Sequence, residues 1–366
     1  MPAKVHIDFD RLPTFRIDHI SGKEVLIASA RRMREKKQDR VVAYTTEEMK
    51  EYVKNCPFCP GNEEQTPLDT WTIRKNLNDP SSWIVRAFPN RFPCHTIEEV
   101  KKPRKSDFFS DNEKHGTGAH EVLVESHLHN GWLSGLTAEN ISHALRAAVE
   151  RYFSLGDDTR FNQFYLFKNY GREAAASLTH PHIQMVCTSR IQKKLQTIFL
   201  RMIEYYVKHN ECLVCRLSAE EKRSKREVLS TKFFTVYVPF AAEAPYELRI
   251  VPKDHNPSFA HVLRNEEVRL DLALTLKASL KKIKFVLQNR TDEPLDLNTI
   301  SDPPYNLMLH TAPYHASYQT NSYHWFIKIV PRTTKMAGYE YGTDTIINPS
   351  IPEEDAEVLR EAPGEY

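Results

Sequence analysis

The sequence predicts an α+β fold of two tandem units, each with a mostly antiparallel sheet and helices packed on one side. The first observation is that segments with strand-like and helix-like hydrophobic periodicity recur in the same order in both halves of the 366-residue chain. The second is that each half carries a Cys-x-x-Cys pair, at 56–59 and at 212–215. We therefore expect a first unit over residues 1–190 and a second over residues 191–366.

The composition is that of an ordinary soluble globular protein, with 40% hydrophobic and 27% charged residues. Lys and Arg number 50 against 48 Asp and Glu, so a net charge of +2 gives no support to nucleic-acid or membrane binding. No apolar segment of a secretion signal stands at the amino terminus, so a cytoplasmic location is expected. Four of the six cysteines lie in the two pairs, which in a reducing compartment indicates metal or redox chemistry.

The first half is predicted to consist of strands followed by one long helix. Strands are expected at 24–28, 83–88, 120–125 and 161–167, with turns at 21–22, 89–93 and 168–171. The helix begins after Thr137, a residue type favoured as an N-cap. The basic run 31–37 is either a solvated loop or a phosphate contact made by Arg31 and Arg34.

The segment 177–188 is the most informative in the chain. As a strand it places His180, His182 and Gln184 on one face. A neutral imidazole is a metal ligand, a base or a nucleophile, and an amide can hold an anionic oxygen. Pro181 removes one ladder donor, so the strand should begin, bulge or lie at an edge there. An amphipathic helix follows over 195–206, and its apolar stripe is interpreted as core.

The second half repeats this pattern. Strands are expected at 233–238, 247–251, 305–310 and 323–330, and a helix is capped at Asn265 before a polar loop at 289–302. The face that carries His180, His182 and Gln184 in the first half maps onto His324, Phe326 and Lys328. Because a phenylalanine takes the place of His182, we expect only the first half to carry the histidine chemistry.

Both units offer four ligands for a closed tetrahedral zinc site. The first set is Cys56, Cys59, His129 and His180, with His127 as the alternative to His129; the second is Cys212, Cys215, His255 and His324, with His310 competing for the fourth place. The equal spacings of Glu121 to His129 and Glu247 to His255 favour His129. We expect zinc in the first site, and the second is either occupied or vestigial. Cys94 and Cys187 are interpreted as packing residues.

The motif Cys56-Pro-Phe-Cys-Pro-Gly-Asn62, the histidine strand and the duplicated layout together resemble the galactose-1-phosphate uridylyltransferase family, nucleotidyl transferases of the histidine-triad superfamily. The resemblance runs from about Val25 to the carboxyl terminus. It implies histidine-triad-like units with half-barrel sheets. It also implies that His180 binds zinc, that His182 attacks the α-phosphorus, and that Gln184 holds a phosphate oxygen.

The resemblance further implies substrate contacts and a homodimer. Phe88 and Asn90 match a nucleoside-binding turn, and the remaining substrate positions are Arg31, Arg34, Asn169, Gly171, Ser177, Lys335, Tyr339 and Glu340. The last three belong to a hexose-binding segment that family members contribute across a dimer interface. A further glutamine of some members has no counterpart, and the cysteines of the second site are closer to the ADP-glucose phosphorylase branch.

We therefore expect a ping-pong nucleotidyl transferase, most simply a UDP-glucose:hexose-1-phosphate uridylyltransferase of galactose metabolism. Its substrates would be a nucleotide sugar and a sugar 1-phosphate. The alternative is an ADP-glucose phosphorylase or related adenylyl transferase that uses phosphate or sulfate. A zinc-ribbon nucleic-acid-binding module is a remote alternative, because no basic stripe with interleaved aromatic residues flanks either cysteine pair.

Overall fold

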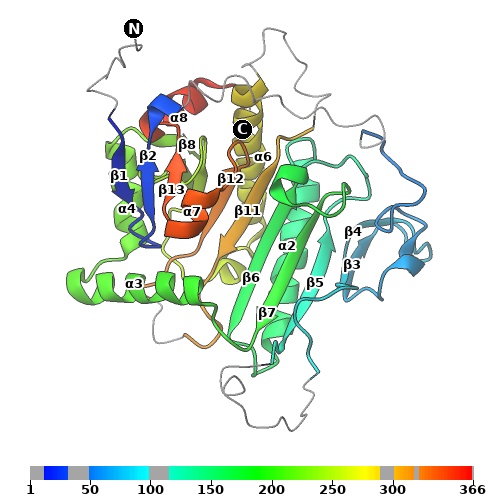
Figure 1. Cartoon of the computed structure of the whole chain (residues 1–366). Helices are drawn as coiled ribbons and strands as arrows, with labels where there is room; N and C mark the ends of the chain where they lie inside the picture. Colours follow the sequence, from blue (N-terminus) through cyan, green and yellow to red (C-terminus); the bar gives the residue numbers. More distant parts are fainter. Residues whose placement is uncertain (1–11, 32–48, 99–114, 289–300, 317–320, 365–366) are drawn as a thin grey trace.

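The computed structural model describes residues 12–31, 49–98, 115–288, 301–316 and 321–364. Within these residues, ten strands form one antiparallel sheet in the order β3-β4-β5-β7-β6-β11-β12-β10-β9-β8 (Figure 1). The strands are β3 (Trp71–Arg74), β4 (Trp83–Pro89), β5 (Gly118–Val124), β6 (Gln163–Tyr170), β7 (His182–Thr188), β8 (Glu227–Ser230), β9 (Phe234–Tyr237), β10 (Leu248–Pro252), β11 (Tyr305–His310) and β12 (Phe326–Pro331).

The strand order repeats about the centre of the sheet. The run β3-β4-β5-β7-β6 from the first half corresponds to β8-β9-β10-β12-β11 from the second, and β6 pairs with β11 where they meet. A mixed α and β fold with a large antiparallel sheet is thus confirmed, and the described strands close no barrel. The boundary near residue 190 stays a prediction, because the sheet continues across it.

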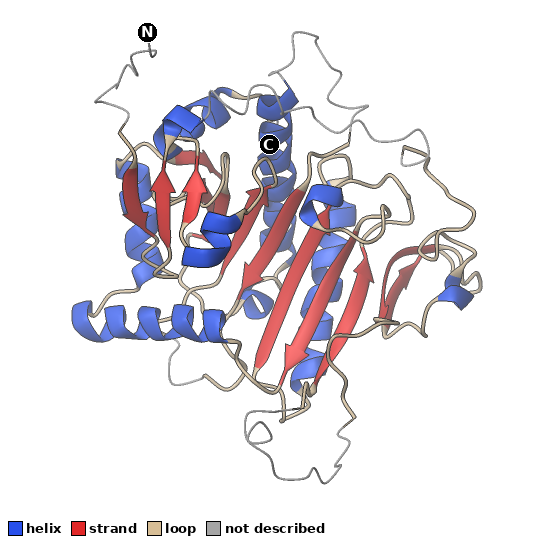
Figure 2. Cartoon of the chain, in the orientation of Figure 1, coloured by secondary structure: helices blue, strands red, loops and turns tan. Residues whose placement is uncertain are grey.

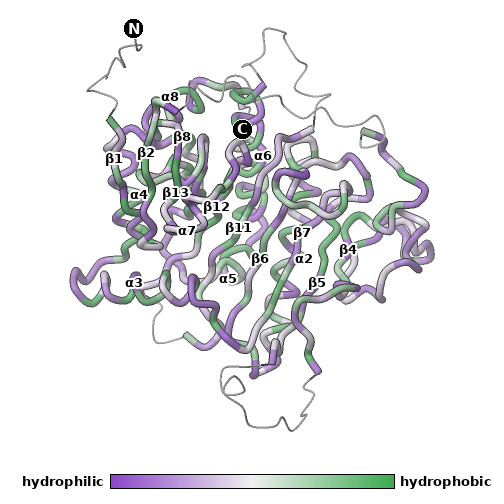
Figure 3. The backbone as a smooth tube through the Cα atoms, in the orientation of Figure 1, coloured by the Kyte–Doolittle hydropathy of each residue, from purple (hydrophilic) through white to green (hydrophobic). Residues whose placement is uncertain are grey.

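Two long helices cover one face of this sheet. These are α2 (Ala138–Gly156) and α6 (Glu266–Gln288), which lie behind the strands in Figures 1 and 2. The Thr137 hydroxyl accepts from the backbone N–H of Asn140, as expected for an N-cap, and Asn265 caps α6 in the same way. Alternate residues such as Ile183 and Met185 of β7 pack against these helices, so hydrophobic residues recur along the strands and helices in Figure 3.

The opposite face is covered differently in the two halves. In the second half it is covered by α3 (Lys193–His209), α4 (Leu213–Arg223) and a small sheet of β1 (Thr14–Ile17), β2 (Glu24–Ile27) and β13 (Ile346–Asn348). Ile198, Phe199 and Met202 of α3 are buried in a second apolar cluster with Phe326, as the stripe predicted. In the first half this face carries the segment around Cys56 and Cys59.

The remaining described elements are short. They are η2 (Ser29–Arg31), η3 (Glu63–Gln65), η5 (Arg172–Ala174), α5 (Phe259–Val262), α7 (Gly338–Thr343) and α8 (Pro352–Glu361). Residues 32–48, with Arg34, lie outside the described residues, as do 289–300 of the expected polar loop. Among the described helices, none combines the length and apolar character that crossing a bilayer requires.

Several local expectations are corrected. Strand β6 continues through Tyr170, where a turn was expected from residue 168, and β12 begins at Phe326 rather than at 323. In the same way β7 begins at His182, so the ligand histidine of each half precedes its strand; Pro181, which has no N–H, fits this start. The second Cys-x-x-Cys pair opens helix α4, with Cys212 at its N-cap.

Two further expectations are wrong. Cys187 is buried as expected, but Cys94 is exposed, because the chain leaves the sheet after β4. Glu247 does not correspond to Glu121. Glu121 pairs with Met185, and its counterpart in the second half is Leu248, which pairs with Ile329. The two residues are eight and seven positions before His129 and His255, so the connection to the ligand histidine is one residue shorter in the second half.

Candidate active site and metal clusters

The first Cys-x-x-Cys pair lies in a tight turn that is held by its own backbone. The N–H of Cys59 donates to the Cys56 carbonyl at 3.1 Å, and the Asn62 amide donates to the Cys56 carbonyl at 2.8 Å and to the Lys54 carbonyl at 2.9 Å. Gly61 has φ +88°, a value that side chains disfavour. The turn therefore presents both sulfur atoms in fixed positions.

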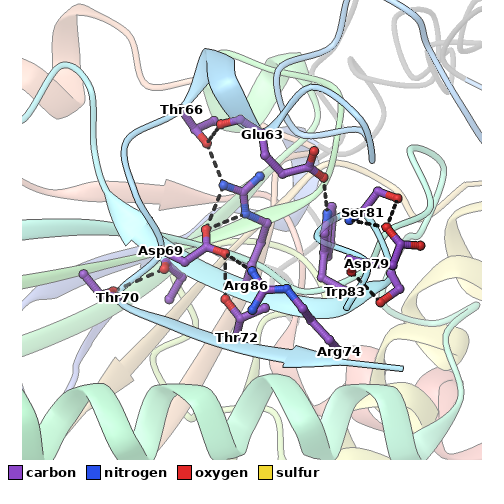
Figure 4. A network of polar contacts seen from close by, with 12 residues as sticks. Glu63, Thr66, Asp69, Thr70, Thr72, Arg74, Asp79, Ser81, Trp83 and Arg86 are labelled. Carbon is purple, nitrogen blue, oxygen red and sulfur yellow. Dashed lines mark hydrogen bonds and ion pairs between the residues drawn. The ribbon is translucent and has the colours of Figure 1, made fainter. Parts of the chain in front are cut away.

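A polar network fastens this turn to the edge of the sheet (Figure 4). Glu63 accepts from the backbone of Gly61 at 3.0 Å and from the Trp83 indole at 2.8 Å, and so joins the turn to β4. The buried Arg86 guanidinium donates to Asp69 at 2.8 Å and stacks 4.6 Å from the ring centroid of Phe88. Arg86 thus packs against Phe88, one of the two residues of the predicted nucleoside-binding turn.

The structure brings Cys56, Cys59, His129 and His180 together, with their ligand atoms all within 4.8 Å of one another. Cys59 Sγ lies 3.6 Å from His129 Nδ1, and both Sγ atoms lie 3.7 Å from His180 Nδ1. A tetrahedral zinc with Zn–S of about 2.3 Å and Zn–N of about 2.0 Å places S and N about 3.5 Å apart. The residues present therefore fit a zinc ion.

The outer nitrogen of each histidine in this cluster is also held. His180 Nε2 lies 2.9 Å from the Ser126 carbonyl oxygen, and His129 Nε2 lies 3.0 Å from the Thr179 hydroxyl. A proton on Nε2 leaves the Nδ1 lone pair free to face a metal. The Cys56 thiol and the two histidines hold the pKa of Cys59 well below its usual range, which favours the thiolate that metals bind.

A second cluster consists of Cys212, Cys215, His255 and His324. Cys215 Sγ lies 3.3 Å from His324 Nδ1 and 3.6 Å from His255 Nδ1, again near the tetrahedral spacing. This cluster is less well supported, because His324 Nε2 has no hydrogen-bond partner in the described part of the chain. The alternatives His127 and His310 lie outside the two clusters.

His182 follows the first cluster on the same face of the sheet. Its Nδ1 donates to the His180 carbonyl at 3.0 Å, so the lone pair is on Nε2. Burial lowers the pKa of His182 to about 4, which keeps the ring neutral at ordinary pH. The Phe58 ring packs edge-on against it at 5.3 Å, a contact that the sequence did not reveal.

The side chain of Gln184 is oriented by a residue that sequence reasoning missed. The backbone N–H of Cys94 donates to Nδ1 of His120, which places the proton of His120 on Nε2. This Nε2–H lies 3.0 Å from Gln184 Oε1 and donates to it, so the Gln184 NH₂ group is left to donate elsewhere. Asn90 also contacts His120, at 3.2 Å. The sequence shows only that His120 and Val122 are two residues apart and so share one face of a strand. The pairing of Val122 with Gln184 is seen only in the structure.

The predicted substrate-binding segment with Asn169 and Gly171, at the end of β6, is fixed by backbone geometry. Gly171 has φ +83°, and a Cβ there would lie 2.9 Å from Pro304. Asn169 Oδ1 accepts from Asn306 Nδ2 at 2.7 Å, which leaves the Asn169 NH₂ group available to a ligand. The segment is therefore fixed by contacts with the second half.

The other predicted substrate residues are not joined to His182. Arg31, Ser177, Lys335 and Tyr339 are exposed, and no described hydrogen bond or ion pair links them to His182 or Gln184. Glu340 is buried and accepts from the Ala337 N–H at 2.8 Å at the start of α7. A contribution of this segment to a partner subunit's site stays a prediction.

Comparisons with known proteins agree with this geometry. The family model for galactose-1-phosphate uridyl transferase, N-terminal domain, matches residues 5–192. The ADP-glucose phosphorylase of Arabidopsis thaliana is 29% identical over 95% of this chain and 93% of its own length. The galactose-1-phosphate uridylyltransferase of Thermotoga maritima is 27% identical over 84% of this chain and 89% of its own length.

Solved structures give the same result. The Arabidopsis ADP-glucose phosphorylase with bound ADP-glucose superposes with a TM-score of 0.77 at 27% identity, over 96% of this chain and 99% of that one. A uridylyltransferase structure reaches 0.68 at 26% identity, over 95% and 97%. The predicted enzyme class and family are thus confirmed. Since the family model spans more than half of its residues, the chain belongs to the galactose-1-phosphate uridylyltransferase family of nucleotidyltransferases.

Proposed function

We propose that the protein transfers a nucleoside monophosphate from a nucleotide sugar through a covalent intermediate on His182. The observation that carries this proposal is the hydrogen bond from His182 Nδ1 to the His180 carbonyl at 3.0 Å. It fixes the tautomer in which Nε2 carries a lone pair, and burial keeps that ring neutral. A neutral, oriented imidazole is a good nucleophile toward phosphorus.

In the first step Nε2 forms a bond to the α-phosphorus, and the bond from phosphorus to the bridging oxygen breaks. The sugar 1-phosphate leaves with the electron pair. In the second step a phosphate oxygen of the acceptor attacks the same phosphorus, the P–N bond breaks, and His182 is regenerated. Gln184 and Asn169 each have an NH₂ group that can donate to the oxygens on which charge develops.

The metal at Cys56, Cys59, His129 and His180 is proposed to be zinc with a structural role. Its four protein ligands leave no open position, which is typical of structural zinc. When bound, the ion supplies a rigid anchor for the chain just before His182. The second cluster offers a similar set of ligands, and we propose that it also binds zinc.

The donor is proposed to be a UDP-sugar or an ADP-sugar, with a sugar 1-phosphate or inorganic phosphate as acceptor. The adenylyl alternative is supported by the Arabidopsis ADP-glucose phosphorylase, which matches 95% of this chain and whose structure holds ADP-glucose. A homodimer is proposed because Lys335 and Tyr339 are exposed, and no described hydrogen bond or ion pair links them to His182 in the same chain.

The test is to incubate the protein separately with UDP-glucose and with ADP-glucose, and to measure the released glucose 1-phosphate and the mass of the chain. The donor that gives an adduct identifies the base. A His182→Gly variant should form no adduct and show no turnover, while its zinc content and its thermal unfolding stay close to those of the wild type. Persistent turnover in this variant would refute the role of His182.

A further inference from the structure

A cavity of about 520 Å³ lies on the same face of the sheet as His182, mainly over the second half. Its floor is formed by β6, β11, β12 and β10, and its walls by α3 and by the turn between β1 and β2. We call it the second-half cavity. Neither His182, nor Gln184, nor any residue of the two metal clusters lines it. Its size is that of pockets that hold small ligands.

The repeat places this cavity where the first half has its reactive residues. Phe326 and Lys328 on β12 stand at the positions of His182 and Gln184 on β7, and both line the cavity. Met308, which pairs with Lys328, corresponds to Phe167, which pairs with Gln184. The cavity is therefore the counterpart of the reactive site, with a phenylalanine in place of the nucleophile.

Charged side chains line the cavity, and most of them are paired. Arg249 donates to Asp18 at 2.7 Å. Lys328 lies 2.8 Å from Glu243 and 3.1 Å from Glu247.

Two further cations line the cavity without a short ion pair in the described part of the chain. Lys194 and Arg332 line the cavity, and neither makes an ion pair with a residue that the structure describes. With Lys23, which lies 3.4 Å from Glu243, the paired groups carry three positive and three negative charges, so Lys194 and Arg332 leave the cavity an excess of positive charge. An excess of two positive charges suits an anion of charge near −2, which is the charge of a phosphate monoester.

The interior also offers an unused hydrogen-bonding group beside aromatic rings. His310 lines the cavity and is 6% exposed, and its Nδ1 has no hydrogen-bond partner among the described residues. Its ring stacks on Phe326 with centroids 4.5 Å apart. Tyr165 and Phe167 add further aromatic surface to the lining. A buried, unpartnered nitrogen of this kind is satisfied by a polar ligand, and the rings suit a ring-bearing molecule.

We propose that the second-half cavity binds a phosphate monoester of a ring-bearing small molecule without reacting with it. The phosphate is held by a cation without an ion pair among the described residues, Lys194 or Arg332, and the ring lies inside near His310 and Phe326. No bond to phosphorus forms, because Phe326 has no nucleophilic atom. This site is separate from the transfer at His182, so it stands whether or not that proposed reaction is correct.

The test is equilibrium dialysis of the full-length chain against AMP, glucose 1-phosphate and inorganic phosphate, each measured alone. We expect AMP to bind at two sites per chain, one at the reactive site and one in the cavity. A Lys194→Gln/Arg332→Gln variant should weaken one of the two sites at least tenfold. A matched Lys208→Gln/Lys222→Gln variant loses the same charge from exposed positions on α3 and α4, and should keep both sites.

A Met308→Trp variant is a second, independent test of binding in the cavity, because the larger side chain fills the cavity and leaves every charge in place. It should also remove one AMP site, while adduct formation at His182 continues. If glucose 1-phosphate alone occupies the cavity, the ligand is a sugar phosphate; if AMP alone does, it is a nucleotide. The proposal is overturned if the wild type and the two cavity variants bind AMP and glucose 1-phosphate with the same number of sites and the same affinities. It is also overturned if Gln184→Leu removes both sites together, since the cavity would then be part of the reactive site.

Discussion

The hydrogen bond between His120 and Gln184 can be tested by replacing His120 with Phe. The Nε2–H of His120 lies 3.0 Å from Gln184 Oε1, and it is this bond that directs the Gln184 NH₂ group away from β5. In the variant the amide loses its fixed orientation but stays in place. We therefore expect a loss of activity that is smaller than the loss on removing Gln184 itself.

The sizes follow from the bonds involved. One neutral hydrogen bond contributes about 1 kcal/mol net, so His120→Phe should lower kcat/KM about fivefold. Removing a donor that faces the developing charge costs about 10² to 10³ in rate, so Gln184→Leu should be far more severe. The other partners of His120 are the N–H of Cys94, an exposed residue, and the half-buried Asn90 side chain, and both can turn to water. The cost to folding should therefore be small.

The assay is a double-mutant cycle on kcat/KM for the nucleotide-sugar donor. If His120 acts through Gln184, then His120→Phe should change the rate by less than about twofold once Gln184→Leu is present. His143→Phe on the outer surface of α2 is the control and should leave the rate unchanged. A fivefold loss that persists in the Gln184→Leu background would show that His120 acts in another way.

Three further changes have predicted outcomes. Cys59→Ser should remove one of the bound zinc equivalents, measured by atomic absorption, and leave the other in place; loss of both would contradict two independent clusters. Burial raises the pKa of Asp18, but the attraction of the Arg249 guanidinium and other nearby donors outweighs this effect and lowers the pKa from the ordinary 3.8 to about 2. The Asp18 carboxylate thus contributes about 2.5 kcal/mol of stability that is present above pH 4 and is lost as the pH falls toward 2. Urea unfolding should show this fall in the wild type and a flatter profile in Asp18→Asn. Gly171→Ala should destabilise the chain by about 1 to 3 kcal/mol, because the alanine meets Pro304 at a positive φ; an unchanged melting temperature would argue against a strained turn.

Local patterns were sufficient for much of the fold. The period of two placed His182 and Gln184 on one face, and Pro181 marked the start of β7. The repeat then placed His255 and His324 with the second cysteine pair, because duplicated units keep the same spatial order of strands. These features depend on residues near one another in sequence, or on the repeat itself.

Contacts between distant strands were beyond the sequence. His120 meets Gln184 only because β5 pairs with β7 in one register, and Asn169 meets Asn306 only because β6 pairs with β11. Nothing in the local pattern encodes such a register, and a shift of one residue turns each side chain to the other face. The same limit explains the wrong correspondence between Glu121 and Glu247, which lie on opposite faces of the sheet.

The central claim is that phosphorus is bound transiently to Nε2 of His182. The most direct measurement is a single-turnover experiment with the preferred nucleotide sugar and no acceptor, followed by peptide mapping of the quenched protein. We predict one equivalent of sugar 1-phosphate released per active chain, with one nucleotidyl group on the peptide that contains His182. Release of sugar 1-phosphate with no adduct, or an adduct on another residue, would contradict this account.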